Sequence, residues 1–248
     1  MGTHQAGSFA EQGYAVFPRV FEGELLALLR AECDDFVARE DARMDAAGTD
    51  VLGISHRGNR YFANECQRER SSLRRVLFSA EMADICRQTI GGTAYFFFDQ
   101  YVVKGPEGGM PFGWHQDSGY VVGNGGPADH APYVTCWCAL DDATIDNGTV
   151  RVIPGSDRNG ILPHARRPGS NDLAVDVDGE GVAIEVPAGS VVAFSSLLLH
   201  ATGANRTDRA RRVYLAQFTR EAMLDPGTRQ LRRNAIAFLA GGRQVTTA

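Results

Sequence analysis

One short stretch of the chain, Trp114-His115-Gln116-Asp117, places an imidazole and a carboxylate two residues apart. In a strand, residues two apart project from the same face, so we expect His115 and Asp117 to converge while Gln116 points away. An imidazole and a carboxylate suit a divalent ion of intermediate hardness, and a second imidazole would complete the facial triad of non-haem Fe(II) oxygenases. An H-x-D tripeptide alone is too short to establish a metal site.

A second segment, SSLLLHATGANRTDRARRVYLAQF, supplies the further imidazole. His200 ends its apolar run, and Arg211 follows eleven positions later (211 − 200 = 11). Arginine presents a planar fork of donors that binds a carboxylate through two hydrogen bonds. Because side chains alternate along a strand, Arg211 and Arg212 face opposite sides, and only one of them can face a barrel interior.

Together these motifs resemble the phytanoyl-CoA dioxygenase family of Fe(II)/2-oxoglutarate-dependent oxygenases, and the resemblance covers most of the chain. In that family an H-x-D pair and a late histidine ligate iron. An arginine eleven residues after that histidine, and a Ser or Thr two residues after it, hold the distal carboxylate of 2-oxoglutarate. The resemblance therefore implies that His115, Asp117 and His200 bind Fe(II), and that Arg211 and Thr202 bind 2-oxoglutarate.

The segment VTCWCALDDATIDNGTVRVIPGSD is also similar to the family. The resemblance implies that Trp137 lines the 2-oxoglutarate pocket, whereas Asp157 departs from the histidine that many members carry after P-G-S; that position is not a ligand. Looser matches place Arg60, and Gln100 with Lys104, near the co-substrate or substrate. For these three residues an exposed polar side chain is an equally good interpretation.

The activity implied by the resemblance is an oxidation that consumes O2 and 2-oxoglutarate and releases succinate and CO2. An unactivated C–H bond of a small metabolite or natural-product intermediate would be hydroxylated, and an acyl-CoA hydroxylase is the alternative. An acyl-CoA carries phosphates, so its enzyme should surround the pocket mouth with basic residues. The predicted mouth loops (41–59, 121–131 and 162–181) favour a neutral or cationic substrate, because their acidic residues (Asp45, Asp50, Asp129, Asp172, Asp176, Asp178 and Glu180) outnumber their basic ones (Arg43, Arg57, Arg166 and Arg167).

Other interpretations explain fewer residues. A metal-dependent hydrolase gives Arg211 and Thr202 no role, a halogenase needs a small residue in place of Asp117, and a non-catalytic cupin-like binding protein should have lost part of the set. Cys136 and Cys138 form a C-x-C pair without a second pair, which favours buried thiols over a zinc site. The remaining histidines lie in polar or loop contexts and are expected at the surface: His4, His56, His130 and His164.

The elements that must position these residues change character along the chain. The first third is mostly helical, with apolar residues at helical spacing over 22–40, a loop over 41–59 and two short helices over 71–92. From residue 94 the pattern is that of short strands, at 94–104, 132–140, 149–155, 182–196 and 211–219. We therefore expect a mainly β fold with flanking helices (α+β), a double-stranded β-helix (jelly-roll, cupin-like) core, and a single domain over 1–248.

Composition limits the partners. The chain has 248 residues, a formal net charge of −5 and a pI near 5.7, so it lacks the positive field that nucleic acid or an anionic membrane would require. Five irregularly spaced cysteines indicate reduced thiols, and no signal peptide or spanning segment is evident, so a cytoplasmic protein is expected. The expected partner is a small-molecule substrate, and the oligomeric state stays open.

Overall fold

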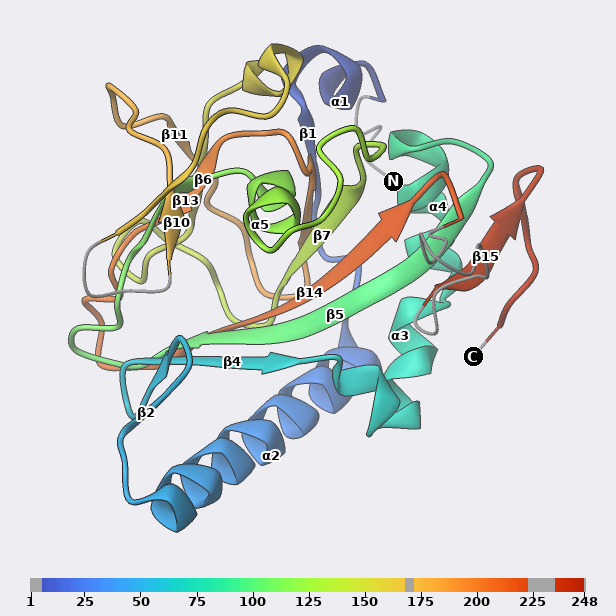
Figure 1. The fold of residues 1–248 in the computed structure, drawn as a ribbon. Helices are drawn as coiled ribbons and strands as arrows, with labels where there is room; N and C mark the ends of the chain where they lie inside the picture. Colours follow the sequence, from blue (N-terminus) through green and yellow to red (C-terminus); the bar gives the residue numbers. More distant parts are fainter. Residues whose placement is uncertain (1–5, 168–171, 223–234, 248) are drawn as a thin grey trace.

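The computed structural model describes residues 6–167, 172–222 and 235–247, and within them the chain forms two facing antiparallel sheets (Figure 1). The large sheet has the order β1-β12-β7-β14-β5-β4-β3-β2, with β15 beside β5 and β16 beside β15. Its strands are β1 (Tyr14–Phe17), β12 (Val191–Ser195), β7 (Val134–Ala139), β14 (Arg211–Thr219), β5 (Ala94–Lys104), β4 (Arg60–Asn64), β3 (Ser55–His56), β2 (Val51–Leu52), β15 (Ile236–Ala240) and β16 (Arg243–Gln244).

The small sheet has the order β11-β8-β13-β6, and a separate hairpin pairs β9 with β10. Their bounds are β11 (Val182–Ala183), β8 (Val150–Val152), β13 (His200–Thr202), β6 (Phe112–His115), β9 (Ala165–Arg166) and β10 (Leu173–Ala174). The expected mainly β architecture with flanking helices is confirmed, and the strands over 94–104 and 211–219 have the predicted bounds.

Helix α2 covers part of the outer face of the large sheet, where it lies beside β4 in Figure 1 and contacts β4 and β14. The α-helices are α1 (Ala6–Gln12), α2 (Gly23–Ala47), α3 (Arg74–Leu77), α4 (Ala80–Thr89) and α5 (Asp117–Gly123), and the 3-10 helices are η1 (Cys66–Arg68), η2 (Ser71–Leu73) and η3 (Ser156–Asn159). None of the helices in the described ranges is long and apolar enough to cross a bilayer.

Strand alternation divides the apolar residues of the large sheet between two cores. On β14, Tyr214 and Ala216 pack outward under the helices, whereas Val213 and Leu215 join the core between the two sheets. Arg211 therefore faces the inter-sheet space and Arg212 faces outward, which confirms the predicted alternation of the adjacent arginines. A site between the two sheets is therefore lined by the large-sheet residues that face the small sheet.

The loop predicted over 41–59 is partly wrong. Helix α2 continues to Ala47, because Met44 extends its buried stripe one turn beyond Glu40 and two turns beyond Phe36. The helix ends at Gly48, which adopts a left-handed conformation (φ 62°) and donates its N–H to the carbonyl of Asp45. Strands β2 and β3 then form a short hairpin, so only the connections are irregular.

Candidate metal centre

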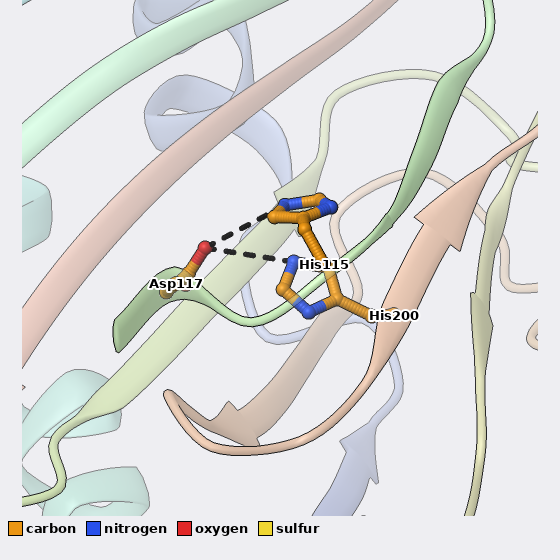
Figure 2. Close-up of side chains that lie close together, drawn as sticks. All are labelled: His115, Asp117 and His200. Carbon is orange, nitrogen blue, oxygen red and sulfur yellow. Dashed lines mark ion pairs between the residues drawn. The ribbon is translucent and has the colours of Figure 1, made fainter. Parts of the chain in front are cut away.

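His115 and His200 come from directly paired positions on β6 and β13, and their ring centroids lie 4.1 Å apart (Figure 2). His115 Nδ1 lies 2.8 Å from the Gly113 carbonyl, and His200 Nδ1 lies 2.9 Å from the Leu198 carbonyl. A carbonyl oxygen only accepts, so each Nδ1 carries the proton. Both Nε2 lone pairs are consequently available on the same side, which is the tautomer that a metal-binding imidazole needs.

Asp117 completes the cluster. Its Oδ1 lies 3.8 Å from His115 Nε2 and 3.5 Å from His200 Nε2, and the three potential ligand atoms all lie within 4.8 Å of one another (Figure 2). The element predicted for Asp117 is wrong: β6 ends at His115, and Asp117 begins α5. The predicted convergence still holds, because Gln116 between them has extended backbone angles (φ −116°, ψ 138°).

The donor set fits Fe(II). Two imidazoles and one carboxylate form the facial triad, which leaves coordination positions on the opposite side of the ion. Burial, reinforced by the neighbouring His200, lowers the pKa of His115 well below its ordinary value. The imidazole therefore stays neutral, as a metal ligand must, throughout the physiological range.

Gln116 anchors the turn that carries two of the ligands. Its carboxamide nitrogen donates to the carbonyls of Gly160 (2.8 Å) and Leu197 (2.6 Å), and its Oε1 accepts from Leu162 N (2.7 Å). Its backbone N–H donates to His164 Nε2 (2.9 Å), so the surface position predicted for His164 is wrong. The ring of His164 packs on Gly119 and binds residues 160–164 to the ligand-bearing turn.

The other histidines outside the cluster are partly covered. His56 is half-buried on β3, and His130 is half-buried with its ring nitrogens 2.8 Å from the Pro127 carbonyl and 3.0 Å from Ser118 Oγ. His4 lies outside the described residues. All five cysteines are buried free thiols, so the buried-thiol interpretation of Cys136 and Cys138 is confirmed.

Two residues that the sequence analysis missed contact Asp117 from the large sheet. Thr135 Oγ1 donates to Asp117 Oδ2 over 2.5 Å, and Gln217 Nε2 lies 3.3 Å from the same oxygen. Neither residue belongs to a recognisable motif. Their only signal is that Thr135 and Gln217 occupy paired, inward-facing positions on β7 and β14, which requires the strand register.

Arg211 is a buried cation with unused hydrogen-bond donors. Its side chain is 1% exposed, its Nη2 donates to the Gly148 carbonyl (3.3 Å), and its Nε and Nη1 have no partner among the described residues. The guanidinium carbon lies 5.5 Å from the ring centroid of Trp137. Burial lowers the pKa of Arg211 to about 10, so it remains charged at neutral pH. A buried charge with free donors implies an anionic ligand.

Lys104 lies between two arginines across the sheet, paired with Arg60 on β4 and with Arg211 on β14. Arg60 already has a carboxylate partner, since its Nη1 and Nη2 bind the two oxygens of Asp172 at 3.1 and 3.2 Å. Lys104 Nζ donates to the Gly203 carbonyl, and no carboxylate pairs with it among the residues that the structure describes. Burial, with Arg211 and Arg60, lowers the pKa of Lys104 to about 5.

Thr202 and Gln100 occupy the remaining predicted positions. Thr202 lies on β13 two residues after His200 and is half-buried, beside the Gly203 carbonyl that Lys104 contacts. Gln100 is half-buried on the same face of β5 as Lys104, paired with Leu215. The structure thus places Arg211, Trp137, Thr202, Lys104 and Gln100 between the two sheets.

Sequence comparisons identify a family. The profile of the family described as phytanoyl-CoA dioxygenase (PhyH) matches residues 9–213. A phytanoyl-CoA dioxygenase from Arabidopsis thaliana is 32% identical over 120 residues (46% of this chain, 40% of that protein). L-proline trans-4-hydroxylase from Streptomyces griseoviridis is 29% identical over 163 residues (56% and 59%), and ectoine dioxygenase from Halomonas elongata is 29% identical over 239 residues (85% and 68%). The chain thus covers less than two thirds of the first two of these relatives.

Solved structures show the same fold. EvdO2 from Micromonospora carbonacea var. aurantiaca, complexed with 2-oxoglutarate, matches with a TM-score of 0.68 at 22% identity, over 91% of this chain and 95% of that one. The non-haem alpha-ketoglutarate-dependent carbocyclase SnoK from nogalamycin biosynthesis matches with a TM-score of 0.71 at 20% identity, over 94% of each chain. These matches support the double-stranded β-helix architecture expected from the sequence.

Proposed function

This chain belongs to the phytanoyl-CoA dioxygenase family of Fe(II)/2-oxoglutarate-dependent oxygenases, and we propose that it hydroxylates an unactivated C–H bond of a small metabolite or natural-product intermediate. The observation that carries this proposal is the convergence of His115, Asp117 and His200 beside a buried arginine whose donors are unused. These three side chains hold the iron. Arg211 binds the distal carboxylate of 2-oxoglutarate.

The co-substrate pocket combines charge and shape. Arg211 and Thr202 hold the distal carboxylate of 2-oxoglutarate, and Trp137 forms an apolar wall under the guanidinium. Lys104 adds a buried amine that pairs with no carboxylate in the described ranges and that the carboxylate of the co-substrate would charge. Arg60 lies on β4 beside Lys104, where its side chain donates to Asp172 and to the carbonyls of Ile54 and Pro111. Gln100 borders the pocket from β5. Iron and 2-oxoglutarate, when bound, supply the activation of O2, with release of succinate and CO2.

Aromatic side chains close the metal centre on the β6 side. The ring of Phe112 lies 4.6 Å from that of His115, and Tyr120 on α5 lies 5.6 Å from His115. Tyr120 also fixes β10, since its hydroxyl accepts from Leu173 N at 3.0 Å. Phe112 and Tyr120 exclude water from the metal centre and pack against the apolar part of the substrate.

The charge near the pocket mouth supports a neutral or cationic substrate. In the 41–59 segment a single arginine, Arg57, serves three carboxylates, those of Asp41 (3.7 Å), Asp45 (2.7 Å) and Asp50 (2.7 Å). This segment cannot attract the phosphates of an acyl-CoA. Two relatives are named for L-proline and ectoine, which are small molecules. Part of the third mouth loop, 168–171, lies outside the described residues.

An acyl-CoA hydroxylase is the second candidate. It is favoured by the exposed adjacent pair Arg166 and Arg167, of which Arg167 lies against the backbone of Gly113, two residues before the first metal ligand. A phosphate at this pair would place a thioester arm near the metal centre. Apart from this pair, the mouth loops offer little positive charge.

The first test is metal and co-substrate binding. Anaerobic addition of Fe(II) and 2-oxoglutarate should produce a weak visible charge-transfer band, and a protein that binds neither refutes the proposal. The second test is stimulated succinate formation with amino acids, free acids, glycosides and acyl-CoAs. Turnover confined to the thioesters selects the second candidate. If the protein binds Fe(II) and 2-oxoglutarate but forms no succinate, either with any of these substrate classes or without a substrate, it is a non-catalytic cupin-like protein.

A further inference from the structure

Asp117 takes part in a closed set of three hydrogen bonds with residues of the large sheet. Thr135 Oγ1 lies 2.5 Å from Asp117 Oδ2, Gln217 Nε2 lies 3.3 Å from the same oxygen, and Gln217 Nε2 lies 3.1 Å from Thr135 Oγ1. Thr135 is fully buried and Gln217 is 8% exposed. The three groups therefore interact with one another and little with solvent.

The donors in this set follow from chemistry. A carboxylate only accepts, so the single hydroxyl proton of Thr135 points to Asp117 and the hydroxyl oxygen must accept from Gln217. Only the amide nitrogen of Gln217 can donate, and its two protons serve Thr135 and Asp117. Rotating the amide by 180° would place its carbonyl against both acceptors. One orientation of each side chain is thus compatible with all three contacts.

The two carboxylate oxygens of Asp117 consequently have different environments. Oδ2 receives both donors from the large sheet, whereas Oδ1 is the oxygen near the Nε2 atoms of His115 (3.8 Å) and His200 (3.5 Å). The register pairs Thr135 with Gln217 on β7 and β14, so the rigid sheet holds both donors in place.

We propose that Thr135 and Gln217 are positioning residues that hold Asp117 as a one-oxygen metal ligand, with Oδ1 toward the ion and Oδ2 withheld from it. The inference rests on the proposed function, because it takes Asp117 as an iron ligand. A carboxylate that bound through both oxygens would occupy one more coordination position. The Thr135–Gln217 pair thereby preserves the positions that 2-oxoglutarate and O2 need.

The test measures Co(II) binding to metal-free protein, by anaerobic titration of the Co(II) electronic spectrum, in Thr135→Val and Gln217→Met. Valine matches the shape of threonine and methionine that of glutamine, so each variant removes donors and little volume. We expect Co(II) affinity to fall by about 10- to 100-fold and the spectrum to change in shape. The double variant should lose little more than either single variant, because the donors act as one unit.

Co-substrate binding provides a second readout. At saturating Co(II), the affinity for 2-oxoglutarate should fall in Thr135→Val, because Oδ2 then competes for a position. Thr135→Ser, which keeps the hydroxyl, should restore both affinities. Thr219→Val is the matched control. It changes a buried threonine on the same strand as Gln217. The Oγ1 of Thr219 accepts from Glu221 N and, within the described residues, contacts none of the three metal ligands.

The results distinguish the metal site itself from the positioning role of Thr135 and Gln217. If wild-type protein binds no Co(II), the metal site itself is refuted. If wild-type protein binds Co(II), and Thr135→Val and Gln217→Met bind it with the same affinity and spectrum, the positioning role is refuted. Should Thr135→Val fail to fold, as judged by thermal unfolding of the metal-free protein, Gln217→Met and Thr135→Ser decide the question.

Discussion

Replacing Arg211 with alanine should weaken 2-oxoglutarate binding by two to four orders of magnitude while leaving metal binding intact. The magnitude follows from the two guanidinium nitrogens, Nε and Nη1, that have no partner among the described residues. A hydrogen bond to a charged group contributes about 1.5–3 kcal/mol. Two of them contribute about 3–6 kcal/mol, which corresponds to about 10²- to 10⁴-fold in affinity.

The assay is an anaerobic titration of 2-oxoglutarate into protein saturated with Fe(II), followed through the charge-transfer band. Arg211→Lys should give an intermediate affinity, because it keeps a positive charge and loses the planar fork. Arg212→Ala is the control at the neighbouring position. Its side chain faces outward and pairs with Asp141 and Asp34, so its removal should leave the 2-oxoglutarate affinity unchanged.

An Arg211→Ala variant that binds 2-oxoglutarate as tightly as the wild type would show that Arg211 does not bind the co-substrate. Loss of affinity in Arg212→Ala instead would mean that the inner face of β14 is assigned wrongly by one residue. Metal affinity measured in the same samples distinguishes a damaged carboxylate pocket from a damaged fold. Loss of both affinities together would indicate structural collapse around the buried arginine.

Three further predictions concern the metal ligands, Lys104 and a buried carboxyl group. His115→Ala and Asp117→Ala should abolish turnover and weaken iron binding without unfolding the domain; an unaltered rate in either variant removes the triad. Lys104→Met should weaken 2-oxoglutarate binding by about 10-fold or more. When 2-oxoglutarate binds to the wild type near pH 7, the protein should take up a proton, because a neighbouring carboxylate charges an amine whose pKa is about 5. Calorimetry in buffers of different ionisation enthalpy measures this uptake, and binding heats that do not depend on the buffer contradict it. Burial raises the pKa of Asp99 from 3.8 to about 6, so the folded state binds more protons than the unfolded state between these values. The contribution of this carboxyl group to the free energy of unfolding should therefore fall by about 2 kcal/mol from pH 4 to pH 6. A chemical-denaturation series in which Asp99→Asn shows the same pH dependence as the wild type refutes this.

The sequence by itself determined the chemistry and most of the elements. His115, Asp117 and His200 were identifiable because the ligands of one ion have characteristic types and intervals in the sequence. The resemblance to the family selected Arg211 as the proposed co-substrate residue. Alternation along β14 separated Arg211 from Arg212, because a strand turns successive side chains to opposite faces. The bounds of β5 and β14 followed from their long runs of β-branched and aromatic residues.

Tertiary structure decided which polar residues meet. Nothing in the sequence pairs Thr135 with Gln217 or brings them to Asp117, because contacts between distant strands depend on a register set by the packing of the whole sheet. For the same reason the partner of Arg60 was not predictable, since Asp172 lies 112 residues away. Secondary-structure propensity depends on neighbouring residues, whereas the tertiary fold determines which distant side chains form a hydrogen bond or an ion pair.

The same distinction explains the local errors. The stretch after Glu40 is polar and was interpreted as a loop, but the burial of Met44 against the rest of the molecule keeps α2 helical to Ala47. His164 lies in a loop sequence that suggests exposure, and the fold places its ring against Gly119, where it accepts from the Gln116 N–H. Burial is a property of the assembled tertiary structure, and no short window of sequence contains it.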